Sequence, residues 1–265
     1  MLQQGYSKRA LRELSAAGRV WLDQTPIRDL ARPAGDATPR VDRGRPRHRP
    51  DVDPAVVHRD PHLVVVYKPS GVLSVPAPGR REASVEDCVR RWFGAAFPVH
   101  RIDEGTSGLL LFALDEHTQL ALKALFQAHD LRRDYLALVR GRPTWEERRM
   151  DTVLVRDRGD GLRGSAPGST AEGKRAVTHL RRVDTYHDVS LVEARLETGR
   201  THQVRIHLAE AGHPILGDTL YGRSSFSRLA LHAAWLAFRH PVRGVELSLR
   251  SPLPDELWRR LHARF

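Results

Sequence analysis

A segment rich in proline and arginine divides this chain into two parts. Residues 33–54 contain five prolines, with five arginines between them. A segment of this kind has too little apolar surface to build a core of its own. We therefore expect a basic linker over residues 36–54, a small unit before it at 1–35, and one large domain over 55–265.

The chain carries an excess of positive charge that is concentrated at its beginning. It has 43 Lys and Arg against 32 Asp and Glu, a net charge of +11, and only four of the basic residues are lysine. Residues 1–50 hold 11 basic and five acidic residues and so contribute +6. Arginine binds phosphate through two parallel hydrogen bonds and stacks on bases, so the charge favours nucleic acid over a membrane as partner. An arginine bias kept for solubility is the alternative.

Composition excludes several classes of protein. The single cysteine, Cys88, rules out a disulfide framework within the chain and a cysteine-rich zinc module. No apolar run approaches the ~18 residues of a transmembrane helix, and the first twenty residues lack the apolar stretch of a secretory signal. The phosphate-binding pattern GxxxxGK[ST] and the nucleophile pattern GxSxG are absent, and no GxGxxG follows an expected strand. We expect a cytoplasmic protein that does not depend on nucleotide hydrolysis.

Strand and helix signals beyond residue 55 predict an α+β domain with a mixed, mainly antiparallel sheet and flanking helices. Residues 62–67 are a β-branched run typical of a buried strand. Ser84 with Asp87 resembles a capping box that opens a helix to about residue 93, and Asp115 can cap a second helix through residue 128. Further strands are expected at 108–114, 134–140, 176–183, 189–198, 230–238 and 245–250, with helices at 201–212 and 254–265 and a flexible loop at 157–173.

Ionisable residues gather in the segment 99–108, immediately before an apolar run that is expected to form a strand. A strand that enters the core would place this preceding segment at the edge of a cleft. Asp103 and Arg101 are two positions apart and can share one face of an extended chain. A surface turn capped by Asp103, with Arg101 in solvent, is the alternative.

A second polar segment, 198–208, begins an expected helix. Arg205 would lie one turn into this helix with its side chain directed toward the N-terminus, where it could pair with a buried aspartate. His202 and His207 are five residues apart, which is unfavourable for two metal ligands on one helix, so we expect no metal site. Tyr135 falls in an expected half-buried strand, where it would be either a core residue or a stacking platform for a base.

Four segments, in this order, resemble the RNA pseudouridine synthases that modify ribosomal large-subunit RNA and transfer RNA. The motifs are a Lys-Pro-x-Gly turn at 68–71, His-Arg-Ile-Asp-x-x-Thr-Ser-Gly at 100–108, Tyr-Leu-Ala at 135–137 and Gly-Arg-x-His-Gln-Val-Arg-x-His at 199–207. The resemblance covers about residues 56–252. It implies a mixed, mainly antiparallel sheet with a central RNA-binding cleft.

The resemblance also implies roles for individual residues. Asp103 would be the catalytic aspartate, Arg205 would pair with it, and Tyr135 would stack on the uracil and take part in proton handling. Arg101 would enter the space that the flipped uridine leaves in the RNA. Three further motif residues are expected to contact the substrate: Lys68, Thr106 and His202. RNA is the implied partner, and we expect a monomer without cofactor or metal.

The implied reaction is an isomerisation of uridine, in which uracil leaves C1′, rotates and rejoins through C5. Nothing is oxidised and no group is imported, so the reaction requires no redox cofactor, metal or nucleotide. A single carboxylate can serve as the nucleophile at C1′ or as the base that removes the 2′ proton. A glycosidase is the chemical rival, but it usually needs two carboxylates, and Asp103 and Glu104 would point apart in a strand. A non-catalytic RNA-binding protein would explain the charge but not the aspartate.

The start of the chain resembles, over about thirty residues, the S4-type RNA-binding module that often precedes this catalytic domain. Ser7 can cap a helix over residues 8–17, and Gly18-Arg19-Val20 follows it. A short strand is expected at 19–23, although Trp21-Leu22-Asp23-Gln24 replaces the usual Val-Asn-Gly. We expect a degenerate S4-like module at 1–35, and a disordered basic arm is the alternative.

Overall fold

The computed structural model describes residues 54–80, 82–166, 173–222 and 226–263, together with the backbone of three short strands before them. These strands are β1 (Val20–Leu22), β2 (Thr25–Pro26) and β3 (Pro39–Val41), and they form an antiparallel sheet in the order β2-β1-β3. Strand β1 coincides with the strand expected at 19–23, whereas β3 lies inside the segment expected to be a linker. The helix expected at 8–17 lies outside the described residues, so the S4-like module stays a prediction.

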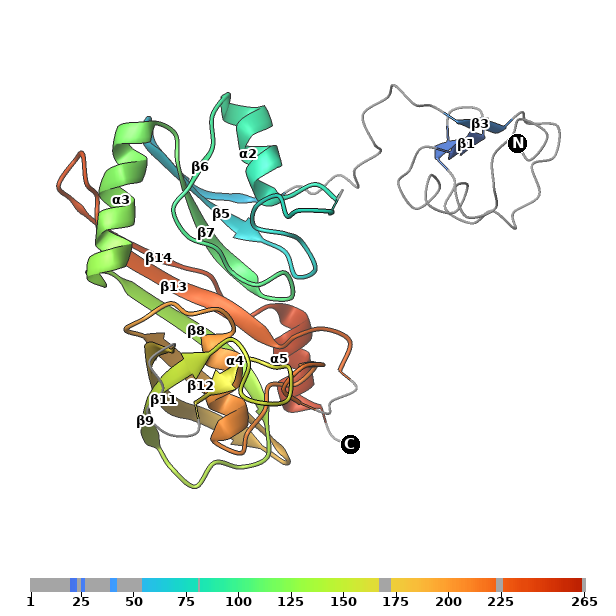
Figure 1. The fold of residues 1–265 in the computed structure, drawn as a ribbon, viewed down its shortest axis with the longest axis vertical. Helices are drawn as coiled ribbons and strands as arrows, with labels where there is room; N and C mark the ends of the chain where they lie inside the picture. The colour runs from blue at the N-terminus through green and yellow to red at the C-terminus, as the bar shows by residue number, and fades with distance from the viewer. Residues whose placement is uncertain are drawn as a thin grey trace.

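The rest of the described chain forms one mixed sheet of eleven strands (Figure 1). Its order is β10-β9-β11-β12-β8-β13-β7-β5-β4, with β14 paired to β13 and β6 paired to β7. Neighbouring strands are antiparallel except β13 and β7, which are parallel, and this confirms the expected fold class. The strands are β4 (Val56–Arg59), β5 (Leu63–Lys68), β6 (Phe97–Pro98), β7 (Ser107–Ala113), β8 (Arg132–Arg140), β9 (Glu147–Val155), β10 (Gly164–Ser165), β11 (Lys174–Tyr186), β12 (Val189–Leu196), β13 (Leu231–Arg239) and β14 (Glu246–Arg250).

Four helices flank this sheet in the described residues: α2 (Val85–Phe93), α3 (Glu116–Ala128), α4 (Gln203–Glu210) and α5 (Asp255–His262). The expected capping box opens α2, because Ser84 Oγ accepts from the Asp87 amide and the Asp87 carboxylate accepts from the Ser84 amide. Asp115 caps α3 by accepting from the Thr118 amide at 2.7 Å. Helix α4 begins at Gln203, two residues later than expected, because His202 stands at the N-cap with a left-handed φ of 59°.

The sheet has two halves (Figure 1), and each half has its own apolar core residues. Strands β5 and β7 are packed on both faces: one face contributes to a core with Leu122 of α3, and the other packs against Val85 and Val89 of α2. Burial on both faces explains why these strands read as continuous apolar runs. The other half, built on β8, β11 and β12, shares a core with Leu208 of α4 and Leu257 of α5.

The two halves meet where β7 and β13 run in parallel. Gly108 of β7 has a φ of 116°, and a Cβ atom there would lie 2.2 Å from the carbonyl oxygen of Ala233. Only glycine allows the two strands to approach this closely. Beside it, Ser107 Oγ lies 2.9 Å from Nδ1 of the buried His232. This junction places the loop that precedes β7 next to β8 and α4.

Strand β9 and its partner β10 were not expected. Strand β9 begins with charged, exposed residues, so it lacks the apolar alternation that predicts a strand. It pairs along its whole length with β11, from Glu147 opposite Arg181 to Leu154 opposite Lys174. Strand β10 falls within the segment 157–173, which was expected to be a loop throughout.

Candidate active site

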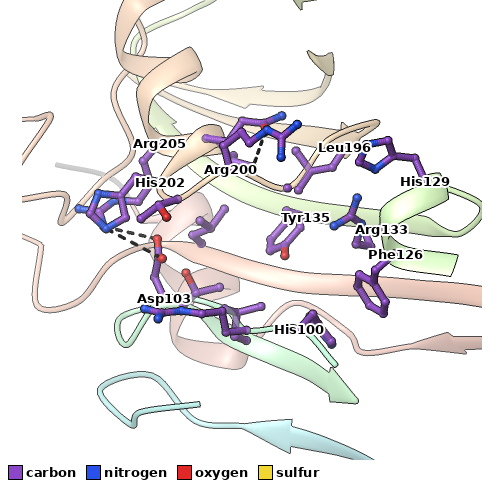
Figure 2. A pocket seen from close by; sticks show the side chains of 18 of the residues that line it. His100, Asp103, Phe126, His129, Arg133, Tyr135, Leu196, Arg200, His202 and Arg205 are labelled. Atoms are coloured by element: carbon purple, nitrogen blue, oxygen red, sulfur yellow. Dashed lines mark hydrogen bonds and ion pairs between the residues drawn. The ribbon is translucent and has the colours of Figure 1, made fainter. Parts of the chain in front are cut away.

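A cavity of about 600 Å³ opens where the loop before β7, the strand β8, the end of α3 and the start of α4 meet (Figure 2). The two polar segments, 99–108 and 198–208, both contribute residues to its lining, although they are about 100 residues apart in the chain. Six of the seven predicted site residues line this cavity: Arg101, Asp103, Thr106, Tyr135, His202 and Arg205. The seventh, Lys68, does not line it.

Asp103 lies in the loop before β7 with its carboxylate partly exposed to the cavity. A turn fixes its backbone, since the Thr106 amide donates to the Asp103 carbonyl at 3.0 Å. Arg205 Nη1 donates to Asp103 Oδ2 at 3.5 Å, which brings together the pair that the sequence predicted. On the other oxygen, His202 Nε2 lies 4.0 Å from Oδ1. The carboxylate therefore faces the cavity with one cation and one imidazole beside it.

Arg205 is held by a second carboxylate, that of Asp218. Its Nε and Nη2 atoms donate to the two oxygens of Asp218 at 2.8 Å each. The Asp218 side chain is fully buried and also accepts from the amides of Leu220 and Tyr221. Burial alone would lower the pKa of Arg205, but the bonds to Asp218 and the charge of Asp103 outweigh it and raise that pKa. Arg205 is thus a fixed cation whose Nη1 group is left to donate to Asp103.

Asp218 was not among the predicted site residues. It belongs to the loop after α4, and nothing in the sequence of that loop indicates which cation the carboxylate meets. The contact depends on the loop after α4 folding back over the helix, so that residues 13 positions apart share an ion pair.

His202 is the second basic group beside Asp103. Its Nδ1 atom lies 2.9 Å from the hydroxyl oxygen of Tyr221, which fixes the ring in the cavity wall. Burial lowers the pKa of His202, and the charge of Asp103 offsets this only in part. The imidazole is therefore neutral at pH 7 and can accept or donate a hydrogen bond.

Tyr135 projects from β8 into the middle of the cavity, as Figure 2 shows. Burial raises the pKa of Tyr135 to about 12; the charge of Asp103 adds to the shift and that of Arg133 opposes it. The phenol is therefore protonated at neutral pH. It offers an aromatic face for stacking and a hydroxyl group that can donate a hydrogen bond.

Comparison with known proteins fits this geometry. Residues 62–210 match the RNA pseudouridylate synthase family. The chain belongs to this family. It is 39% identical over 236 residues to the ribosomal large subunit pseudouridine synthase D of Zymomonas mobilis, covering 80% of this chain and 74% of the relative.

Two further relatives place the chain among the RNA pseudouridine synthases, which are isomerases. The dual-specificity RNA pseudouridine synthase RluA of Pasteurella multocida is 36% identical over 214 residues, covering 77% of this chain and 96% of the relative. Among solved structures, human RNA pseudouridylate synthase domain containing 1 superposes with a TM-score of 0.67 at 26% identity. That superposition covers 78% of this chain and 86% of the human chain.

The prediction that Lys68 contacts the substrate is wrong. Its side chain is completely buried, and Nζ donates to the carbonyl oxygens of Pro69, Val72 and Glu104 at 2.6 to 3.0 Å. All three ammonium hydrogens are therefore used within the protein. The β-branched strand that Lys68 ends is covered on both faces, so the side chain has no route to the cavity.

The turn at 68–74 instead supports the loop that carries Asp103. Besides Lys68, the amide of Gly71 donates to the Glu104 carbonyl at 2.8 Å and Ser70 Oγ donates to the Gly105 carbonyl at 2.6 Å. Ser74 Oγ donates to the Ile102 carbonyl at 2.7 Å. These bonds hold the backbone on both sides of Asp103, so the first motif of the synthase positions the second.

Arg101 and Thr106 are placed as substrate contacts would be. Arg101 is exposed at the rim of the cavity and has no hydrogen bond or ion pair with the described residues. Thr106 is almost fully buried, and its Oγ1 atom has no hydrogen-bond partner in the described part of the chain. Both side chains have polar groups available for a ligand, and their contact with substrate stays a prediction.

Two further motif residues of 199–207, Gln203 and His207, hold helix α4 against the sheet. Gln203 accepts from the Arg200 amide and from Thr198, and it donates to the Val177 carbonyl and to Thr178. His207 is buried, with Nδ1 at 2.8 Å from Thr178 Oγ1 and Nε2 at 3.0 Å from Thr152 Oγ1. These bonds tie the start of α4 to β11 and β9.

Among the described residues, no three His, Cys, Asp or Glu side chains lie where they could hold a metal ion. Within the same residues, every helix is too short or too polar to cross a membrane.

Proposed function

We propose that this synthase converts a specific uridine of structured ribosomal or transfer RNA to pseudouridine, with Asp103 as the catalytic carboxylate. The observation that carries the proposal is the contact of Asp103 with Arg205, itself fixed by Asp218, on the wall of a cavity of about 600 Å³. This volume is in the range that takes a small ligand of nucleoside size. Ribosomal RNA is the first substrate to test, since the relative from Zymomonas mobilis is named for it.

The target base has to leave its stack before Asp103 can reach C1′. Arg101 is exposed at the rim and free to enter the vacated space, and Tyr135 offers a ring face to the extruded uracil. A stacked base gains roughly 1–3 kcal/mol from such a platform, which offsets part of the cost of unstacking. The cavity can thus hold the base next to the carboxylate.

The bond changes then balance without any added reagent. Asp103 either bonds to C1′ as the C1′–N1 bond breaks, or removes the 2′ proton to give a glycal as uracil departs with the bonding electrons. Uracil rotates and C5 bonds to C1′. As this bond forms, the Asp103–C1′ bond breaks in the first route, and Asp103 returns the proton to C2′ in the second. The proton on C5 is then released and N1 takes up a proton, so the carboxylate is regenerated. Arg205 keeps Asp103 oriented in both routes, and the neutral phenol of Tyr135 can donate a hydrogen bond to the detached uracil.

The residues before the catalytic domain are proposed to add RNA affinity. Residues 1–35 are proposed as a degenerate S4-like module and 36–54 as a basic linker, and together they contain all ten arginines of the first 50 residues. Basic residues that neutralise phosphates release counterions, so this part would make binding depend on salt. We expect the chain to act as a monomer in the cytoplasm, which light scattering and cell fractionation would test.

The test is to map pseudouridine in total RNA from cells that have or lack this protein, and to add the purified protein back. We expect one or a few uridines to be modified only when the protein is present. Identical maps, together with no modification by the purified protein, would exclude the proposed activity.

A further inference from the structure

Arg133 is a buried cation in the wall of the catalytic cavity. It stands on β8 two residues before Tyr135, so the two side chains leave the same face of the strand. Arg133 is only 8% exposed, and its Nε and Nη2 atoms are buried without a hydrogen-bond partner among the described residues. A buried guanidinium without partners costs free energy, which a bound anion would recover.

The neighbouring carboxylates do not pair with Arg133. Asp134 leaves the opposite face of β8 and pairs with Arg132 at 2.6 Å and with Arg195 at 3.4 Å. Glu197 pairs with His179 at 2.5 Å and does not line the cavity. Within the described part of the chain, Arg133 forms no ion pair.

More positive charge surrounds Arg133 at this end of the cavity. Lys123, His129 and Arg200 line the cavity with it. In Figure 2, Tyr135 lies between Arg133 and Asp103. Asp103 is the one acidic side chain among the described residues that line the cavity. The cavity therefore has one end at Asp103, where the proposed chemistry takes place, and a second, basic end whose residues have no role in that chemistry.

The guanidinium of Arg133 is held in place from two sides. Its Cζ atom lies 5.3 Å from the ring centre of Phe126, which also stacks on His100. On the other side, a Cβ atom at Gly199 would lie 2.6 Å from Arg133 Nη1, so a larger residue would displace the guanidinium. A donor group fixed in this way is preorganised for a ligand.

The basic end continues over the surface. A hollow of about 280 Å³ shares Gly199, Arg200 and Thr201 with the cavity. Its other charged lining residues are Arg156, Arg163 and Lys174, and no acidic side chain among the described residues lines it. Positive side chains therefore extend from Arg133 past Arg200 to Arg156, which follows β9, and Lys174, which begins β11.

We propose that Arg133 and Arg200 bind a backbone phosphate of the RNA strand next to the uridine held at Tyr135, and that the strand leaves the cavity through the hollow. Phosphate suits the site because it accepts hydrogen bonds from several guanidinium groups at once. The position of this phosphate relative to the target uridine rests on the proposed function, whereas the anion site itself does not.

The test uses the full chain and a fluorescein-labelled 12-nucleotide oligouridine, with affinity measured by fluorescence anisotropy over a range of salt concentrations. We expect Arg133→Gln to weaken binding roughly 10- to 100-fold, the loss expected for hydrogen bonds to a charged group. The slope of log affinity against log salt should fall by about 0.7, one phosphate contact. Arg243→Gln is the matched control. It makes the same charge change, and Arg243 is exposed at the turn after β13.

Melting temperature separates a binding role from a structural one. Removal of an unpaired buried cation should leave the melting temperature of Arg133→Gln unchanged or higher. An affinity equal to that of Arg243→Gln, or a large drop in melting temperature that accompanies the loss of binding, overturns the proposal. Arg200→Gln and Lys174→Gln change residues near the surface, and both should weaken binding and lower the salt slope without affecting folding.

An oligouridine with neutral methylphosphonate linkages distinguishes phosphate from base recognition. It should bind the wild-type chain and Arg133→Gln with equal, weak affinity. If the wild-type chain still binds this probe more tightly than Arg133→Gln does, Arg133 contacts a base, which contradicts the phosphate assignment. If binding behaves as expected while the wild-type chain forms no pseudouridine, the anion site stands and the proposed function fails.

Discussion

Arg205 Nη1 lies 3.5 Å from Asp103 Oδ2, while its Nε and Nη2 atoms hold Asp218 at 2.8 Å. Two of the three guanidinium nitrogens thus bind a buried partner, and Nη1 remains for the carboxylate in the cavity. Asp218 does not line the cavity, so it acts on the site through Arg205. Asp218 is therefore a positioning residue.

Asp218→Asn tests that role. Loss of the charge leaves Arg205 buried without its partner, which costs about 3–5 kcal/mol of unfolding free energy for a pair of this kind. We expect kcat to fall at least tenfold with little change in KM, because the amide no longer fixes Arg205 against Asp103. The control is Asp160→Asn, which removes the exposed ion pair with Arg158 and should change neither property. Full activity in Asp218→Asn would show that Arg205 orients Asp103 unaided.

Lys68→Met tests whether the first motif supports the loop of Asp103. The methionine fills the space but leaves the carbonyls of Pro69, Val72 and Glu104 without their donor. We expect a loss of roughly 1–3 kcal/mol of unfolding free energy for each buried carbonyl left unsatisfied, and a lower kcat at unchanged RNA affinity. Chemical denaturation and steady-state kinetics measure these. Weaker RNA binding at full stability would restore Lys68 as a substrate contact.

Two buried histidines predict acid sensitivity. Burial lowers the pKa of His207 and His232 to about 4, below the usual 6.5. Between pH 4 and 6.5 the unfolded chain binds these protons and the folded chain does not, so stability falls as pH falls through this window. Each histidine contributes a slope of at most about 1.4 kcal/mol per pH unit.

Urea unfolding between pH 5 and 6.5 measures this slope above the range where carboxylates titrate in the unfolded chain. His232→Gln should lower the slope, because glutamine keeps a hydrogen-bonding group near Ser107 without binding a proton. A slope that is flat in the wild type, or equal in the variant, would contradict the burial argument.

Tyr135→Phe separates stacking from hydrogen bonding. The phenylalanine keeps the ring that faces the cavity and removes the hydroxyl, whose pKa burial raises to about 12. We expect RNA affinity within about twofold of wild type, because stacking survives. Turnover should slow by roughly 10²-fold if the hydroxyl holds the detached uracil, a loss typical of a positioned proton donor. Single-turnover kinetics would detect this, and an unchanged rate would reduce Tyr135 to a stacking residue.

The sequence was informative where a local rule determines the outcome. Ser84 and Asp87 predicted the start of α2, and Asp115 predicted that of α3, because capping depends on residues within one helical turn. The motif around Asp103 and that around Arg205 predicted their meeting only through resemblance to the family. Strand β9 was missed because its exposed, charged face carries no apolar period.

Contacts between distant segments could not be derived in the same way. Lys68 was placed at the substrate because it belongs to a motif of the family, yet the strand it ends is covered on both faces and buries it. Nothing in the sequence indicated Asp218, because its contact with Arg205 depends on how the loop after α4 folds back. Arg133 could have been noticed, since a period of two puts it on the same face of β8 as Tyr135. Its lack of a partner is visible only in the folded chain.

Asp103→Asn tests the central claim most directly. The substitution keeps the size of the side chain but removes the charge that would serve as nucleophile or base. The measurement is the amount of pseudouridine formed in the target RNA by wild-type and variant protein at equal RNA occupancy. We predict that the variant binds the RNA nearly as well as wild type and forms no pseudouridine. Pseudouridine formed by Asp103→Asn at a rate near that of wild type would contradict the account.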